Sequence, residues 1–157
     1  MRRVLPVLRL YSSWLCKNIS VLANNIDRTF APLQVELWSA FARNLTLINA
    51  KFPPDILPGP LEYMLEEDED TIGLKALHCD ENQYIWFNDR GSRPKWHEMA
   101  AEKRNVGTEM LSRLRDLLTV GVALVVDQVS CLLIDCCPVL LLTYSLASAP
   151  WFRCGYP

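Results

Sequence analysis

The sequence predicts an all-α fold: helical hairpins from an α/α superhelix, a long ordered loop and a hydrophobic C-terminal tail. Apolar residues recur at steps of three and four in three separate stretches, which is the spacing of one helix face, and they do not alternate as in a half-buried strand. Prolines stand at the ends of these stretches, where helices start and stop. Together these patterns favour packed helices over sheets.

The first two helices are predicted over residues 4–24 and 32–50. Pro32 suits the first turn of the second helix, because the N–H that proline lacks is unsatisfied there in any residue. The prolines at 53 and 54 end that helix. The connection between the two helices is short, so we expect an antiparallel hairpin with facing apolar stripes. One hairpin cannot cover both of its faces, so further helices must pack on it.

A long connection follows the hairpin. Prolines between residues 53 and 60 predict a rigid loop, and residues 61–65 favour one or two helical turns with Pro60 at the first position. The acidic run Glu66–Asp70 lacks the ligand spacing of a calcium loop, which favours a solvated or partner-facing edge. Residues 74–104 show no sustained periodicity, so we expect a long ordered loop held by aromatic residues. Loops of this length within a domain are commonly functional.

The last predicted helix has Thr108 at its N-terminal cap and runs to about residue 125. Its apolar residues fall on one face at helical spacing. Arg113, Arg115 and Asp116 are predicted on the opposite, polar face. We therefore expect an amphipathic helix that closes the helical domain.

Composition limits the function. The 157 residues suit one domain, and 16 basic against 18 acidic residues give a net charge of −2, which excludes a globally basic nucleic-acid binder. Six cysteines are too few for a disulfide scaffold, which favours reduced thiols in the cytosol or nucleus. The sequence holds no nucleophile elbow, phosphate-binding glycine loop or zinc-ligand spacing. We therefore expect no enzyme activity, no cofactor and no metal site.

Residues 90–115 combine positive charge with nearby aromatic rings. A single-stranded nucleic acid requires both, because cations bind its phosphates and rings stack on its bases. If nucleic acid binds directly, the predicted contacts are Arg90, Arg93, Lys95, Trp96, Lys103 and Arg104. The alternative is that the aromatic residues anchor the loop to the core while the cations are solvated or pair with the acidic residues 66–70.

Residues 128–152 have the length and apolar character of a transmembrane helix, but Asp135 and Pro138 interrupt them. An acidic residue near mid-span costs about 2.5–3.5 kcal/mol on insertion. The alternatives for residues 127–157 are a tail anchor, a buried core helix, and a segment of different origin from the rest of the chain. If the chain contacts a membrane, residues 128–152 are the one segment predicted to do so.

Four segments of the sequence resemble segments of a known family and occur in the same order. Residues 5–15 carry a Leu-Pro, basic, aromatic and Trp pattern, and residues 37–42 follow as part of a partner helix. Residues 65–77 form an acidic segment that ends in Gly and Leu74, and residues 109–118 form the closing helix. Together they resemble the helical domain of the ever-shorter-telomeres and SMG-type family, including its fungal members. These proteins are telomerase-associated and nonsense-mediated-decay adaptors. The family usually has an aromatic residue at the position of Leu74.

The resemblance covers residues 4–125 and implies a partial, all-helical DNA/RNA-binding domain over residues 1–126. Residues 127–157 follow it as a hydrophobic tail of uncertain origin, and our hypothesis is that residues 128–157 come from non-homologous coding sequence. It implies non-catalytic work as an adaptor or scaffold in nonsense-mediated mRNA decay or telomere maintenance, in the nucleus and/or cytoplasm. The implied partners are RNA or single-stranded DNA and decay or telomerase proteins. The tetratricopeptide domain that normally precedes this domain is absent from the sequence, so we expect a fragment. The rival interpretation is a small tail-anchored membrane protein with a cytosolic helical domain.

Overall fold

The computed structural model describes residues 3–24, 31–71, 74 and 93–126. This part of the chain is helical and contains no β-strand, which confirms the predicted all-α fold. Its long helices are α1 (Leu5–Asn24), α2 (Ala31–Lys51) and α5 (Val106–Val126), and the short helix α3 (Glu66–Asp70) lies between α2 and α5 in the chain. The bounds of α1 and α2 agree with the sequence prediction to within one residue.

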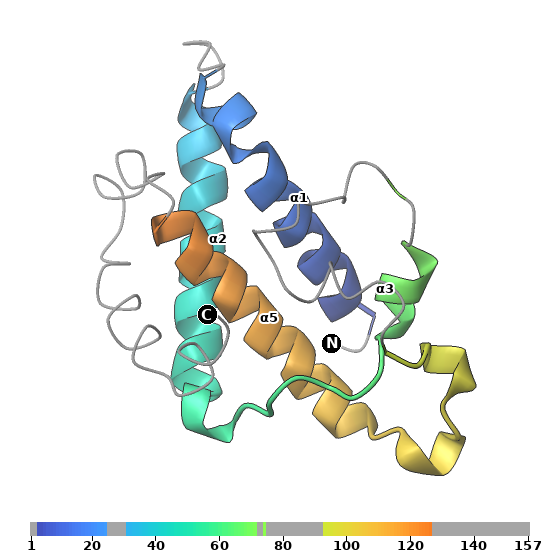
Figure 1. Ribbon diagram of the computed structural model, residues 1–157. Coiled ribbons are helices and arrows are strands. Elements are labelled where there is room, and N and C mark those ends of the chain that lie inside the picture. Colours follow the sequence, from blue (N-terminus) through green and yellow to red (C-terminus); the bar gives the residue numbers. More distant parts are fainter. Residues whose placement is uncertain (1–2, 25–30, 72–73, 75–92, 127–157) are drawn as a thin grey trace.

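Helix α5 lies across both of the other long helices (Figure 1). Each of α1 and α2 makes its most extensive helix contact with α5. The prediction that further helices pack on the first two is therefore confirmed. Because apolar burial contributes about 25 cal/mol for each Å² removed from water, the apolar face of α5 is what holds the first two helices in one domain.

Two apolar clusters along α5 form the core. The first contains Leu5, Leu45, Leu57, Leu114, Leu117, Leu118 and Val122. The second contains Leu15, Cys16, Trp38, Val120 and Leu124. Gly121 lies on α5 opposite α2, and a Cβ atom at this position would overlap Leu45 Cδ1. Glycine therefore allows these two helices to approach each other closely.

Residues 61–65 differ from the prediction, because they are not helical and α3 begins only at Glu66. Leu65 has the extended backbone angles φ −73° and ψ 155°. The Met64 N–H donates to the carbonyl of Pro94 at 3.0 Å instead of to a carbonyl one turn earlier. Tyr63 and Leu65 are both buried, and side chains two residues apart share a face in extended chain, not in a helix.

Helix α5 begins at Val106, so its N-terminal cap lies three residues before the predicted cap, Thr108. Its cap is Asn105, whose Oδ1 accepts the Thr108 N–H at 3.1 Å, and asparagine is among the preferred N-cap residues. The predicted solvent-facing polar side of this helix is wrong. Arg113, Arg115 and Asp116 are buried, with at most 8% of each exposed. Their charges are paired: Arg113 with Glu67 of α3, Asp116 with Arg9 of α1, and Arg115 with Asp116 of α5 itself.

Two short 3₁₀ turns lie in the described part of the predicted long loop: η3 (Trp96–Glu98) and η4 (Ala101–Lys103). Residues 75–92 of that loop and the tail, residues 127–157, lie outside the described residues. Within the described part, no helix has both the length and the apolar character needed to cross a membrane. The domain boundary at residue 126 and the tail anchor over residues 128–152 remain predictions.

Candidate nucleic-acid interface

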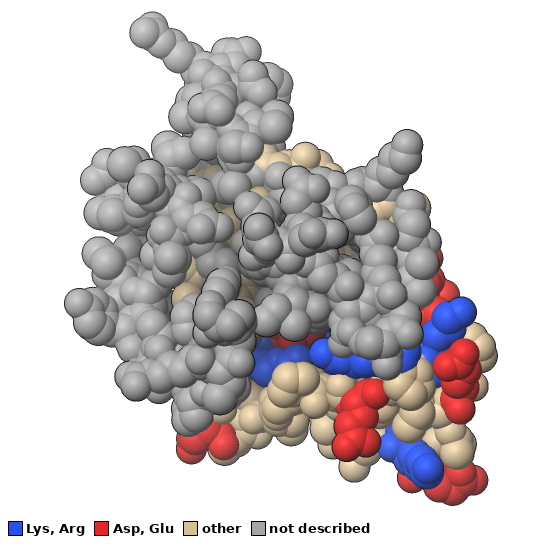
Figure 2. All heavy atoms as spheres, viewed as in Figure 1, with Lys and Arg blue, Asp and Glu red and all other residues tan. Residues whose placement is uncertain are grey.

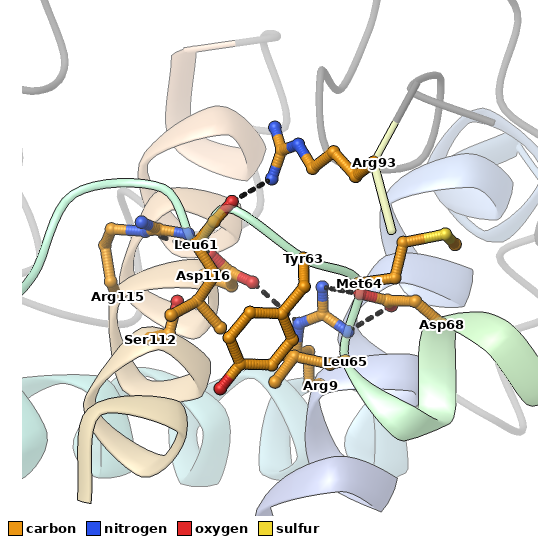
Figure 3. A pocket seen from close by; sticks show the side chains of 10 residues that line it. All are labelled: Arg9, Leu61, Tyr63, Met64, Leu65, Asp68, Arg93, Ser112, Arg115 and Asp116. Atoms are coloured by element: carbon orange, nitrogen blue, oxygen red, sulfur yellow. Dashed lines mark hydrogen bonds and ion pairs between the residues drawn. The ribbon is translucent and has the colours of Figure 1, made fainter. Parts of the chain in front are cut away.

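A buried network of charged side chains lies where α1, α3 and α5 meet, with Arg9 of α1 at its centre (Figure 3). Arg9 is only 1% exposed. Its Nε donates to Asp116 Oδ2 at 2.7 Å, and its two terminal nitrogens donate to the two carboxylate oxygens of Asp68. One guanidinium group thus joins α1 to both α3 and α5.

Arg113 of α5 forms a second junction with α3. Its Nε and one terminal nitrogen donate to the two oxygens of Glu67, each at 2.8 Å. Its other terminal nitrogen lies 3.5 Å from Glu109 Oε2, one helical turn earlier. A paired, two-point contact of this kind is how buried charges are compensated for the loss of water.

Arg115 extends the network to the connection that follows α2. Its Nε and one terminal nitrogen donate to Asp116 Oδ1 at 3.0 and 2.6 Å. Its remaining terminal nitrogen donates to the carbonyl of Pro58 at 3.2 Å. The oxygens of Asp116 therefore hold two guanidinium groups at once, one from α1 and one from α5.

Acid exceeds base within this network. Three guanidinium groups give +3, and the carboxylates of Glu67, Asp68, Glu109 and Asp116 give −4, a sum of −1 when all are ionised. Burial raises the pKa of Asp68 above its ordinary value, and the nearby Glu67 and Asp116 raise it further against the opposing effect of Arg9. For Arg9, burial disfavours the charge, yet Asp116 and Asp68 together raise its pKa.

The raised pKa of Asp68 predicts a pH effect on stability. Where the folded chain binds this proton more tightly than the unfolded chain, the contribution of Asp68 to the free energy of unfolding grows as the pH falls through the folded-state pKa. The Asp68→Asn variant lacks this contribution. We expect the wild type to gain stability relative to D68N as the pH falls from about 7 towards about 4.5, measured by urea unfolding. A relative loss of stability over that range would contradict the assignment.

We call residues 93–104 the basic segment. It carries five of the six predicted contact residues: Arg93, Lys95, Trp96, Lys103 and Arg104. The sixth, Arg90, lies outside the described residues. Lys95 and Lys103 are exposed, and neither forms an ion pair with the described part of the chain. Their charges are therefore accessible to a ligand.

Three contacts fix the course of the basic segment. Arg93 is half-buried and donates to the carbonyl of Leu61 at 2.9 Å. The indole Nε1 of Trp96 donates to Glu109 Oε1 at 3.3 Å. The guanidinium carbon of Arg104 lies 4.1 Å from the centroid of the Trp96 ring, within the range of a cation–π contact. The structure thus brings a cation and an aromatic ring together, with the exposed lysines in the same segment.

The acidic run Glu66–Asp70 is not the solvated edge that the sequence favours, because Glu67 is buried and its neighbour Asp68 is largely so. The run does pair with cations, as the alternative interpretation predicts. Its partners include Arg9 and Arg113 of the long helices and His97, whose Nδ1 contacts Glu69. The two exposed lysines are not among those partners.

The described surface carries no broad region of one charge on the face that Figure 2 shows, where basic and acidic side chains lie side by side. Within the basic segment itself, Glu98 and Glu102 are exposed beside the lysines. This agrees with the small net charge of the chain. A nucleic-acid site in this part of the protein is consequently a local one of a few cations, and does not rest on a large positive field.

A pocket beside Arg9 is lined by residues of the buried network, among them Asp68 and Asp116, and by Tyr63 and Leu61 (Figure 3). Its volume of about 20 Å³ suits about one water molecule, whereas small-molecule sites measure roughly 300–1,000 Å³. Within the described residues, no three His, Cys, Asp or Glu side chains are grouped so that they could hold a metal ion. This pocket is therefore too small to hold a small-molecule ligand.

Helices α1 and α3, which contribute Arg9, Glu67 and Asp68 to the buried network, lie in the part of the chain that matches a known family. Residues 1–81 match the model of the Est1 DNA/RNA binding domain, which is 81 of the 157 residues. The chain belongs to this family. The expected ever-shorter-telomeres and SMG-type relationship is thereby confirmed, and the chain carries a domain of a nucleic-acid-binding type. No curated protein and no solved structure matches the chain.

The Est1 match includes α1, α2 and α3, and it ends before the basic segment and α5. Arg9 and Glu67 lie within the matched residues, but their partners Asp116 and Arg113 lie beyond them. In this chain the Est1-type helices are therefore completed, in both apolar core and charge, by a helix that follows the match. The resemblance of residues 109–118 to the family remains a prediction.

Glu109 is absent from the residues that the sequence predicts for the site, although it holds Trp96. One part of its role is visible in the sequence, because Glu109 and Arg113 stand four residues apart, the spacing of an ion pair on a helix. Its contact with Trp96 has no such signal. That contact depends on how the basic segment folds back onto α5, which no local pattern encodes.

Proposed function

We propose that this chain is a non-catalytic adaptor that binds single-stranded RNA or DNA through its basic segment, in nonsense-mediated mRNA decay or telomere maintenance. The observation that carries the proposal is the Trp96–Arg104 pair, with the exposed Lys95 and Lys103 in the same segment. Membership of a family whose domain is described as DNA/RNA-binding supports the same class of ligand.

Each part of this arrangement suits an unpaired strand. Lysine side chains bind phosphates by charge, and this attraction weakens with salt because counterions compete. The flat indole and guanidinium groups offer surfaces for stacking, which contributes about 1–3 kcal/mol per base. A duplex keeps its bases stacked on one another, so it offers this segment phosphates alone. We therefore propose a preference for single strands.

We further propose residues 1–126 as the binding unit, since α5 completes the core of the Est1-type helices and carries the residue that holds Trp96. The adaptor's protein partners would be components of the decay or telomerase machinery, and its place of action the nucleus, the cytoplasm or both. The tail-anchor alternative concerns residues 128–152, which lie outside the described part, and no described feature favours it.

The test is a titration of the full chain into a fluorescein-labelled single strand of about 15 nucleotides, followed by anisotropy at several salt concentrations. We expect weak binding at low salt that falls steeply as salt rises, and weaker binding of a duplex of the same length. A flat salt response, or no binding at low ionic strength, would overturn the proposal and leave protein binding as the adaptor's work.

A further inference from the structure

Glu109 is buried on α5 and binds the edge of the ring that the proposed nucleic-acid site uses. We propose that Glu109 is a positioning residue for that site: by accepting the Trp96 indole N–H it holds the ring where the basic segment presents it to a base. This inference rests on the proposed function and adds to it a residue that touches no ligand itself.

Within the described part of the chain, the side chain of Glu109 binds Trp96, Tyr63 and Arg113. Its Oε1 accepts both the Trp96 Nε1–H at 3.3 Å and the Tyr63 hydroxyl at 3.1 Å. Its Oε2 lies 3.5 Å from a terminal nitrogen of Arg113. Glu109 is 6% exposed. Burial raises the pKa of Tyr63, and the hydrogen bond to Glu109 raises it further. Tyr63 therefore stays protonated and remains a donor.

The backbone around Trp96 is held in place, since the Lys95 N–H donates to Glu98 Oε2 at 2.9 Å and the Met64 N–H donates to the Pro94 carbonyl, but these bonds do not set the side-chain torsions of Trp96. Trp96 opens a 3₁₀ turn of three residues, and the residues on either side of the turn, Lys95 and Met99, have extended backbone angles. Such a turn has few internal hydrogen bonds, so the ring orientation depends on what the side chain contacts. The edge of the indole is bound to Glu109, while Arg104 lies over its face. The hydrogen bond at the edge therefore restrains the orientation of the ring.

If Glu109 acts through its charge, replacing it should strengthen strand binding; if it acts by holding Trp96, replacing it should weaken strand binding. Variants at this position therefore separate the two roles. Removing a negative charge near exposed lysines should strengthen the binding of an anionic strand if charge alone matters. Removing the acceptor of the indole N–H should weaken it if position matters. Glu102 provides a control, because it is an exposed acidic residue of the basic segment that forms no hydrogen bond with Trp96 among the described residues.

The experiment compares the full-length wild type with Glu109→Ala, Glu109→Gln and Glu102→Ala, using the same labelled single strand at fixed low salt. We expect E109A to weaken binding about tenfold, the scale of losing a hydrogen bond to a charged group, and E102A to leave it unchanged or strengthen it. Because glutamine keeps an oxygen acceptor, we expect E109Q to retain wild-type affinity even though losing the charge opposite Arg113 lowers its melting temperature.

The melting temperature of each variant shows whether affinity merely follows stability. The proposal fails if E109Q and E109A weaken binding in proportion to their loss of stability, or if E109A behaves like E102A. A variant pair gives a further check: in the Trp96→Phe background, which lacks the N–H, E109A should have no additional effect on affinity. If the wild type binds no single strand, the proposed function itself fails, which distinguishes the two results.

Discussion

Replacing Arg9 with alanine is expected to lower the free energy of unfolding by about 3–5 kcal/mol, because it leaves the buried carboxylates of Asp68 and Asp116 without their shared partner. That loss is a large part of the 5–15 kcal/mol that typically stabilises a domain. Chemical unfolding followed by circular dichroism measures it. Arg43→Ala is the matched control, since Arg43 is an exposed arginine of α2 and its removal should change stability by less than about 0.5 kcal/mol.

A second variant keeps this prediction testable if R9A does not fold. In the Arg9→Ala background, Asp116 keeps its contact with Arg115, whereas Asp68 loses the guanidinium group that it binds. Adding Asp68→Asn removes this uncompensated charge and should restore part of the stability. If R9A is as stable as R43A, or if adding D68N makes R9A less stable still, the network does not hold the helices together in the way that the contacts indicate.

Replacing both Lys95 and Lys103 with alanine is expected to weaken the binding of a single strand about tenfold at low salt. Each phosphate contact contributes about 0.7 to the slope of log affinity against log salt concentration, so removing two should reduce that slope by about 1.4. Anisotropy at four or more salt concentrations measures both quantities. Stability should be almost unaffected, because both side chains are exposed.

The matched control for the lysine pair is Arg43→Ala with Lys51→Ala on α2. This variant removes the same total charge from exposed positions outside the basic segment. It should leave the salt slope near that of the wild type. Equal losses in the two double variants would mean that the strand senses overall charge and not this segment.

The helices could be predicted from the sequence because their apolar residues repeat with the period of a helix. This local signal gave α1 and α2 to within a residue. The same signal misplaced the polar side of α5, since periodicity separates apolar from polar positions but cannot tell a solvated charge from a buried, paired one. Arg9 and its partner Asp116 stand 107 residues apart, so their pairing appears only once α1 packs on α5.

The candidate site was predicted in part for the same reason. Charge and aromatic character are properties of residue types, so the sequence could single out Lys95, Trp96 and Arg104 without knowing the fold. Which cations pair internally could not be predicted, because it depends on which face of α5 meets the acidic helix α3. Arg113 is paired with Glu67, whereas the two lysines of the basic segment are exposed.

The central claim is that the basic segment is the surface on which a single strand lies. Photocrosslinking tests it most directly: a 4-thiouridine-labelled single strand is irradiated on the full chain, and the attached peptides are identified by mass spectrometry. We expect crosslinks to residues 93–104, centred on Trp96, that disappear at high salt. Crosslinks confined to α1, α2 or residues 127–157 would contradict it.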